Sequence, residues 1–352
     1  MSSPRLLAVI TGERGRREIV RPLEAIGYRI EVIDWEDLCR AGRFPHARFL
    51  AVLWTMLCGG GHGFTHVFTD MSSVFLAAVL ALSKPRDCKV LMRLRGDLFA
   101  ESRDQIRFHF LHRQWGSWLR TMVSFGLDRL LFRFVDRYVP VSHWIVRRLG
   151  IETKSVVVRI PCDPAAFTRK VHDAPTLRLL AVTNFNYPQK VGPMGAFFER
   201  SAAFLQANRI EVSVAGTGIA LEMFRERYGS KIHFLGHVAA IGSLYAGHDA
   251  FIHFSGLDAF PYVVLEAQAS ALPVMVNNDC GMLEQVENGV TGLIVALETK
   301  DEVERTLLAL KQSPELRERF GAAGLAAVSR DYSLQKIGRD LQAALEGETN
   351  SV

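Results

Sequence analysis

Short apolar runs rich in β-forming residues alternate with helical patterns along most of the chain. The first series of runs comprises Leu6 to Ile10, Tyr28 to Ile33, His66 to Phe68, Lys89 to Met92, Arg137 to Val141 and Ser155 to Ile160. The second comprises Leu177 to Val182, Glu211 to Ala215, Ile232 to Leu235, Ala250 to Phe254, Pro273 to Val276 and Gly292 to Val295. Strands that alternate with helices predict parallel sheets with helices on both faces. The pattern therefore predicts an α/β protein of two tandem Rossmann-like domains.

A break in the alternation separates the two series. The polar stretch from Arg169 to Pro175 has no period, so we place the boundary after residue 168, with domains at 1–168 and 169–331. A chain of 352 residues is long enough for two such domains. Residues 332–352 then form a terminal helix and tail. Leu334, Ile337, Leu341 and Leu345 share one face of this helix, which we expect to pack back on the first domain.

Residues 101–135 are too long for an ordinary connection and are rich in arginine and aromatic residues. They predict two amphipathic helices inserted into the first domain. One interpretation places a basic, aromatic face against a membrane, where it presents a lipid-linked acceptor. The other places the aromatic rings in the core and the arginines in solvent. We do not expect nucleic acid as a partner, because no nucleic-acid motif accompanies the charge.

Composition narrows the class of protein. The chain is 49% hydrophobic and 22% charged, which is typical of globular proteins. Its start lacks the apolar region of a secretion signal, and its apolar runs are shorter than the roughly 20 residues of a membrane helix. The five cysteines have no C-x-x-C spacing, so we expect neither a disulfide framework nor a zinc site. This cysteine pattern favours a reducing compartment, and we expect a cytoplasmic protein. The net charge of +5 suits nucleotide phosphates or anionic lipid.

The segment from Ser255 to Val274 carries the chemistry. It runs from the end of a strand through a loop into a helix that begins near Pro261. The start of that helix offers N–H groups and the positive end of a dipole, which suit a diphosphate. Glu266 lies about 7 to 8 Å along the helix axis, where it can accept hydrogen bonds from a ribose diol. Asp258 lies in the loop ahead of the helix, on the side where a sugar would bind.

Two other interpretations apply to this acidic pair. A glycosidase uses two carboxylates as acid and base, but such a pair flanks one bond, whereas here a phosphate-binding helix end lies between the two acids. Alternatively, Asp258 is an ordinary loop residue and Glu266 a solvated helix residue.

The motifs resemble those of the retaining glycosyltransferases of family 4, also called group 1. Asp258-Ala-Phe-Pro-Tyr-Val-Val-Leu-Glu266 matches the family signature of two acids separated by seven residues. The match continues through Cys280-Gly-Met-Leu-Glu284-Gln-Val and Gly289-Val-Thr-Gly292. Upstream, Val214-Ala-Gly-Thr-Gly and Phe234-Leu-Gly-His-Val are similar to further family segments. The resemblance implies two Rossmann-like domains facing across a cleft, the GT-B type, with the donor bound by the second domain.

The resemblance also implies roles for particular residues. The residues expected to bind the donor are Asn184, Gly216, Gly236, His237, Val238, Phe260, Pro261, Tyr262, Glu266 and Glu284. Lys190 is expected to neutralise the leaving diphosphate and Asp258 to hold the sugar. Gly12, in a glycine turn after the first strand, is a further candidate because such a turn lets backbone approach a ligand.

The chain departs from the family pattern at three positions. The first acid of the signature is Asp258, one methylene shorter than the family's glutamate. Asn184 stands where the family has a phosphate-binding arginine. The family's histidine in the first domain is absent, and Arg93-Leu-Arg95-Gly-Asp97 stands there. Arg95 is expected to serve the phosphates or the acceptor and Asp97 the acceptor hydroxyls, unless this loop is a turn with solvated charges.

No metal or other cofactor is expected. The run Gly59-Gly-Gly-His62 with nearby His66 is typical of a loop rather than a metal site. The resemblance also implies that no divalent metal is needed, because family members of this fold do not need one. The nucleoside-diphosphate sugar is expected as the donor substrate.

The expected function is retaining transfer of a hexosyl unit from a nucleoside-diphosphate sugar to a hydroxyl of a saccharide or lipid-linked acceptor, without a covalent nucleophile. The expected location is the cytoplasm or the inner face of its membrane. A sugar-nucleotide epimerase or phosphorylase has no supporting motif. An NAD-dependent oxidoreductase would need a third glycine where Leu221 follows Gly216-Thr-Gly218. A scaffold that keeps the fold but has lost the site is a further alternative, given Asn184 and the missing histidine.

Overall fold

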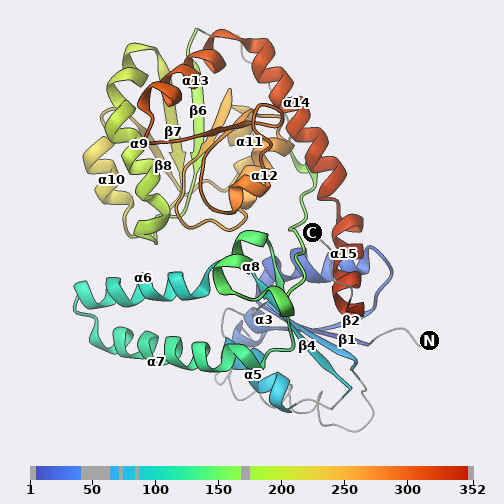
Figure 1. The fold of residues 1–352 in the computed structure, drawn as a ribbon. Helices are drawn as coiled ribbons and strands as arrows, with labels where there is room; N and C mark the ends of the chain where they lie inside the picture. Colours follow the sequence, from blue (N-terminus) through green and yellow to red (C-terminus); the bar gives the residue numbers. More distant parts are fainter. Residues whose placement is uncertain (1–4, 41–63, 71–73, 84–86, 168–174, 348–352) are drawn as a thin grey trace. The chain divides into compact units, whose positions relative to one another are not determined.

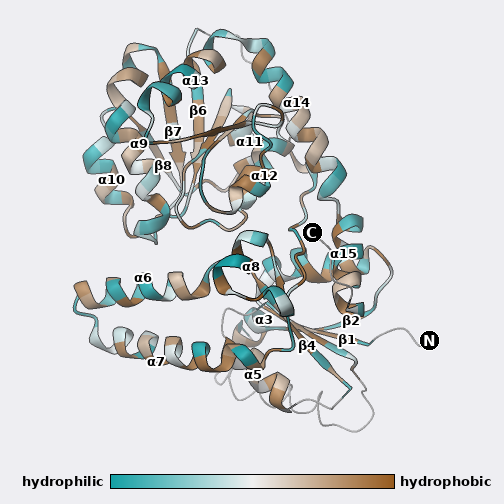
Figure 2. Cartoon of the chain, viewed as in Figure 1, coloured by the Kyte–Doolittle hydropathy of each residue, from teal (hydrophilic) through white to brown (hydrophobic). Residues whose placement is uncertain are grey.

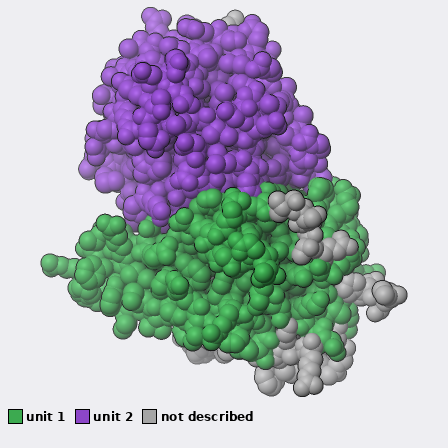
Figure 3. Space-filling view, in the orientation of Figure 1, with its two compact units in different colours: residues 1–161, 334–352 green, residues 162–333 purple. Residues whose placement is uncertain are grey.

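The chain divides into two compact α/β units (Figure 3). The first contains residues 1–161 and 334–352, and the second contains residues 162–333. The structure, a computed structural model, describes residues 5–40, 64–70, 74–83, 87–167 and 175–347. The boundary expected between residues 168 and 169 lies outside these described ranges, as does His62.

A parallel sheet of five strands, in the order β2-β1-β3-β4-β5, forms the centre of the first unit (Figure 1). The strands are β1 (Leu6–Ile10), β2 (Ile30–Asp34), β3 (His66–Thr69), β4 (Lys89–Leu94) and β5 (Arg137–Pro140). Every side chain of β1 is buried, as is typical of a central strand covered on both faces.

Helices surround this sheet and extend beyond it. They are α1 (Gly12–Gly15), η1 (Arg16–Val20), α2 (Arg21–Glu24), α3 (Trp35–Arg40), α5 (Val74–Ser83), α6 (Leu98–Leu111), α7 (Trp115–Leu131), η2 (Phe132–Phe134), α8 (His143–Leu149), η3 (Glu152–Lys154) and α15 (Leu334–Glu346). The two helices predicted for residues 101–135 are α6 and α7, so this prediction is confirmed.

The terminal helix α15 packs on the first unit, as predicted. Ile337 and Leu341 are fully buried in one hydrophobic cluster with Leu6 of β1 and Leu23 of α2. A Cβ at Gly338 would lie 2.2 Å from the carbonyl oxygen of Pro22, so the two backbones approach more closely than a larger residue would allow. The chain therefore returns to the first unit after completing the second.

The segment from Ser155 to Ile160 is not a regular strand, although the apolar pattern predicted one. It makes a bridge to Tyr138 and donates backbone hydrogen bonds from Val156 and Val158 to β5. The carbonyl of Val158 in this segment accepts a hydrogen bond of 2.6 Å from Nη1 of the Arg93 guanidinium. A side chain thus satisfies backbone acceptors that a neighbouring strand would otherwise satisfy.

The second unit holds a parallel sheet of six strands, in the order β11-β10-β9-β6-β7-β8. The strands are β6 (Leu177–Val182), β7 (Ile210–Ala215), β8 (His233–Gly236), β9 (Ala250–His253), β10 (Val274–Asn277) and β11 (Leu293–Val295). The helices are η4 (Pro164–Ala166), α9 (Pro188–Ala207), α10 (Leu221–Tyr228), α11 (Ile241–Ala246), α12 (Tyr262–Ala269), η5 (Cys280–Glu284), α13 (Lys300–Gln312) and α14 (Pro314–Asp331). Figure 2 shows the apolar strands enclosed by helices with hydrophilic outer faces. The loops after these strands emerge at one edge of the sheet, which is where α/β folds bind ligands.

Candidate functional site

The loop that joins β9 to α12 is fixed from two sides. Asn277 at the end of β10 accepts a hydrogen bond from the backbone N–H of Ser255 and donates one to its carbonyl oxygen, at 2.9 and 3.1 Å. The N–H of Gly281 donates to the carbonyl of Asp258 at 3.0 Å. A Cβ at Gly281 would lie only 1.5 Å from the carbonyl oxygen of Ala259, so glycine is required for this approach. The loop is thus held in a defined conformation.

Asp258 is the most strongly held side chain of this loop. Its Oδ1 lies 2.7 Å from Nζ of Lys190, near the start of α9, and its Oδ2 lies 2.8 Å from Nε2 of His253, at the end of β9. Burial by itself would raise the pKa of the Asp258 carboxyl, but Lys190 and His253 hold that pKa well below its ordinary value. The side chain is therefore a carboxylate with two fixed partners at neutral pH.

Glu266 is the fifth residue of α12 and is half-buried. Its Oε2 accepts a hydrogen bond of 3.0 Å from the hydroxyl of Tyr245, which belongs to α11 and is fully buried. Burial raises the pKa of Tyr245 well above its ordinary value, and the charge of Glu266 raises it further. The tyrosine hydroxyl therefore stays protonated and orients the carboxylate.

The N-terminus of α12 lies between the two acids in the sequence. Pro261 is its N-cap and contributes no capping side-chain hydrogen bond. The neighbouring residues are fixed: Phe260 is buried against the ring of Tyr332, and the carbonyl of Pro261 accepts a hydrogen bond from Nε2 of Gln285. An uncapped helix start on a fixed loop is suited to an anionic group of a ligand.

Three further loops meet at the same sheet edge. The N–H of Gly216, after β7, donates to the carbonyl of Gly236, at the end of β8. Gly216 has φ of +141°, and a Cβ there would lie 1.8 Å from the carbonyl oxygen of Thr183. Asn184, exposed after β6, accepts a hydrogen bond of 2.8 Å from the N–H of Asn186. The backbones of the loops after β6, β7 and β8 therefore lie close together.

The other candidates of this unit lie at the same edge of the sheet or close to it. His237 is exposed and Val238 half-buried in the loop after β8. Tyr262 is half-buried in the first turn of α12, and Glu284 is half-buried at the end of η5. The structure thus brings Lys190 and Asp258 into contact, while Glu266 has its own partner in Tyr245.

Gly12, Arg95 and Asp97 belong to the first unit. Gly12 has φ of +62°, and its N–H donates to Oδ1 of Asp34 at 2.9 Å. Asp97 is the N-cap of α6, where Oδ1 accepts hydrogen bonds from the N–H groups of Phe99 and Ala100. Its Oδ2 lies 2.5 Å from Nε of Arg148. These contacts give Asp97 a structural task at the start of the helix.

Arg95 belongs to a buried network of charges. Its guanidinium contacts Oε2 of Glu18 at 3.0 Å and Oδ2 of Asp70 at 2.6 Å. Glu18 also contacts Arg93, and the side chains of both are fully buried. Burial alone would raise the pKa of Glu18, but Arg93, Arg95 and Arg14 lower it from 4.5 to about 2. The side chain of Arg95 is 19% exposed, and all three nitrogens of its guanidinium donate hydrogen bonds to Glu18 or Asp70.

Sequence reasoning missed His253, Tyr245 and Asn277. Each orients a predicted residue or its loop, and each lies within or beside a strand that the apolar pattern had located. His253 ends β9 and Asn277 ends β10, and polar residues at the ends of buried strands were the signal available for them. Tyr245 carried no such signal, because only the packing of α11 against α12 brings its hydroxyl to Glu266.

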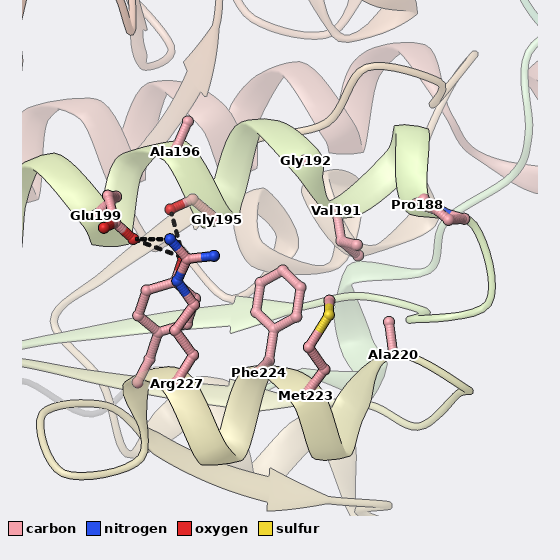
Figure 4. Close-up of a pocket in the computed structure, with 11 residues that line it drawn as sticks. Pro188, Val191, Gly192, Gly195, Ala196, Glu199, Ala220, Met223, Phe224 and Arg227 are labelled. Atoms are coloured by element: carbon pink, nitrogen blue, oxygen red, sulfur yellow. Dashed lines mark hydrogen bonds and ion pairs between the residues drawn. The ribbon is translucent and has the colours of Figure 1, made fainter.

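A cavity of about 360 Å³ lies between α9 and α10 (Figure 4). Its apolar lining includes Val191, Met223 and Phe224, and an ion pair of 2.9 Å between Arg227 and Glu199 lies at one end. None of the predicted site residues lines it. It is therefore separate from the polar side chains at the sheet edge.

Within the described ranges, no group of three or more His, Cys, Asp or Glu side chains is arranged to hold a metal ion. Over that same part of the chain, no helix has both the length and the apolar character required to span a bilayer.

Part of the second unit matches a known protein family. Residues 205–326 match the family model described as "Glycosyl transferases group 1". The viral protein ORF31 (virus isolate Australia/Victoria), provisionally named a glycosyltransferase, is 28% identical over 61% of this chain and 66% of its own length. The GDP-mannose-dependent monoacylated alpha-(1-6)-phosphatidylinositol monomannoside mannosyltransferase of Corynebacterium glutamicum is 26% identical over 56% of this chain and 55% of its own. The match thus spans between about half and two thirds of these relatives.

The fold as a whole is similar to that of solved glycosyltransferases. The crystal structure of Anabaena HepE in complex with UDP and glucose superposes with a TM-score of 0.67, covering 98% of this chain and all of HepE at 16% identity. The two parallel sheets and their helices therefore form the two-domain α/β fold predicted from the sequence.

Proposed function

We propose that this chain, whose residues 205–326 match the family model of group 1 glycosyl transferases, transfers a hexosyl unit from a nucleoside-diphosphate sugar to a hydroxyl acceptor, with retention of configuration. One observation carries the proposal. Asp258 and Glu266 lie on opposite sides of an uncapped helix start in the sequence, and each is oriented by its own partners. This arrangement suits a ligand with a sugar, a diphosphate and a ribose in that order.

Each group of the donor then has a matching part of the site. Glu266, held by Tyr245, accepts hydrogen bonds from the ribose hydroxyls. The first turn of α12, from Tyr262 onward, receives the diphosphate, with Lys190 as the nearby cation. Asp258 holds hydroxyls of the hexose. Charge that grows on the leaving diphosphate is stabilised most in the transition state, so Lys190 accelerates the transfer rather than merely tightening binding.

The first unit supplies the acceptor side in this proposal. Arg95, whose side chain is 19% exposed, is the residue of this unit that we assign to the acceptor, while Asp97 supports the loop. A lipid-linked acceptor is supported by the name of the Corynebacterium relative, which describes a phosphatidylinositol-linked substrate for that protein. We propose that the enzyme works at the cytoplasmic face of a membrane and uses no metal or other cofactor.

A second function is favoured by one observation. Lys190 forms an ion pair with Asp258, and Asn184 stands where the family pattern has an arginine. The site therefore holds less positive charge than that pattern implies. A protein that binds the nucleotide sugar without transferring it would show these features.

The experiment measures thermal stabilisation by UDP, GDP and ADP, followed by release of the nucleoside diphosphate from the matching sugar nucleotides. Transfer predicts stabilisation by one diphosphate and its acceptor-dependent release. Stabilisation without any release supports the binding protein, and no stabilisation by any of the three contradicts both.

A further inference from the structure

Helices α6 and α7 form an antiparallel pair that extends from the first unit (Figure 1). Their facing sides pack through aromatic rings: Phe99 lies edge-on to Phe125 and Phe132, and Phe110 contacts Trp118. Asp128 of α7 is buried, and Ser124 donates to its carboxylate at 3.4 Å. The aromatic residues of this segment are therefore divided between a packed side and an outer side.

The outer side of α7 carries an exposed apolar stripe. The stripe consists of Trp115, Leu119, Met122, Val123, Leu127 and Leu130, all at least 40% exposed. Their spacing of three and four residues places them on one face of the helix. At 1.5 Å per residue the stripe is about 20 to 25 Å long. At the tip of the hairpin, Leu111 of α6 is also more than half exposed.

Positive charge borders this stripe. At 100° per residue, Arg120 and Arg129 fall on opposite edges of it, and both are exposed. The only acidic residue of α7 is Asp128, which is buried. An apolar face edged by arginines, without exposed carboxylates on this helix, is complementary to an anionic lipid surface.

A polar cavity of about 450 Å³ lies at the root of the hairpin. It is lined by Asp97, Phe99, Arg103, Arg129, Phe132, Arg148 and Leu149. Three guanidinium groups and one carboxylate line it, and Asp97 is paired with Arg148. Arg129 also lies over the rings of Phe99 and Phe125, with its Cζ 5.6 and 5.9 Å from their centroids. The net charge of the lining is therefore positive, from groups that bind phosphate well.

We propose that this cavity binds the phosphate of a lipid-linked acceptor while the apolar stripe of α7 rests in the membrane interface. Arg129 joins the two features, because it lines the cavity and also borders the stripe. A phosphate in the cavity thus lies at the depth of lipid headgroups. This inference rests on the proposed glycosyltransferase function and names the substrate class for it: a lipid phosphate.

The test uses phosphatidylcholine vesicles that contain a polyprenyl phosphate, the corresponding polyprenol, or neither. Flotation of the full chain with the first kind, and much weaker flotation with the other two, is expected. Excess inorganic phosphate in solution is expected to leave the vesicles bound, because the apolar stripe contributes to binding. Complete displacement by inorganic phosphate would assign the cavity to a free anion and overturn the proposal.

Matched variants locate the site. Arg103→Gln/Arg129→Gln is expected to weaken binding to the phosphate-bearing vesicles on the order of tenfold. Arg107→Gln/Arg113→Gln removes equal charge from the same hairpin outside the cavity and is expected to have a much smaller effect. Leu119→Ser/Val123→Ser, both at exposed positions, is expected to weaken binding to every kind of vesicle. Equal effects of the two arginine pairs would contradict a phosphate site in the cavity.

The wild-type chain is titrated with nucleoside diphosphates in parallel. Vesicle binding without any nucleotide binding would refute the glycosyltransferase function, on which the acceptor role rests. Nucleotide binding without discrimination between polyprenyl phosphate and polyprenol would refute the lipid-phosphate site alone.

Discussion

Nζ of Lys190 lies 2.7 Å from Oδ1 of Asp258, so the cation assigned to the diphosphate and the acid assigned to the sugar form one ion pair. Both side chains are less than 20% exposed, and the pair joins the start of α9 to the loop before α12. The pair therefore orders the loop as well as providing charge for the reaction. The two tasks can be separated by mutation.

We expect Asp258→Asn and Lys190→Gln each to destabilise the protein by about 1 to 3 kcal/mol, because each removes the ion pair from a partly buried charge. The double variant should lose less than the sum of the two. Urea unfolding of all four proteins measures this coupling. Strictly additive losses would show that the ion pair contributes nothing beyond the separate side chains.

Tyr245→Phe is expected to weaken nucleoside diphosphate binding about tenfold while the fold persists, because only the hydroxyl that orients Glu266 is removed. Tyr228→Phe is the matched control, since its hydroxyl bonds to Glu199 beside the cavity between α9 and α10. Calorimetric titration of both variants checks the prediction. Equal nucleoside diphosphate affinities of the two variants would show that the Tyr245 hydroxyl does not contribute to binding.

Gly216→Ala is expected to disrupt the loop after β7, because its Cβ would collide with the carbonyl of Thr183 at a φ of +141°. Loss of nucleotide binding and a lower melting temperature should follow. Gly192→Ala in α9 has open space around the added Cβ and should leave stability unchanged or raise it by up to about 1 kcal/mol. Thermal unfolding of the two variants compares them directly.

Acid should destabilise the first unit through Glu18, whose pKa in the folded protein is about 2 against an ordinary 4.5. Because folding lowers this pKa, the stabilisation is fully present above pH 4.5 and is lost as the pH falls towards 2. The shift corresponds to roughly 3 kcal/mol. Glu18→Gln should therefore lower stability at neutral pH and flatten its pH dependence between those limits. Denaturant unfolding as a function of pH measures both, and an unchanged acid dependence would contradict the assignment.

Much of this fold follows from the sequence. Buried parallel strands are continuous apolar runs, so their positions were predictable to within a few residues, and the amphipathic pattern of α15 predicted that it would be buried. The segment from Ser155 to Ile160 was the exception, because the side chain of Arg93 competes for its carbonyls and no local pattern shows that.

The site was predictable in part. Glu266 and Asp258 could be found because their spacing reflects one loop and one helix. Tyr245, the partner of Glu266, could not be found, since its contact depends on how separate elements pack. His253, the partner of Asp258, carried only the signal of a polar residue at the end of a buried strand. Arg95 and Asp97 remain candidates for the acceptor side, but their contacts with Glu18, Asp70 and Arg148 show that buried ion pairs also place charged residues at a sheet edge.

In the proposed function, Glu266 holds the ribose of a nucleoside-diphosphate sugar. Calorimetric titration of the wild-type protein and of Glu266→Ala with UDP, GDP and ADP tests it most directly, with Glu226→Ala on the exposed face of α10 as the control. One diphosphate is expected to bind the wild type and the control equally, and to bind Glu266→Ala at least about tenfold more weakly. Equal affinity for all three proteins, or no binding to the wild type, would contradict it.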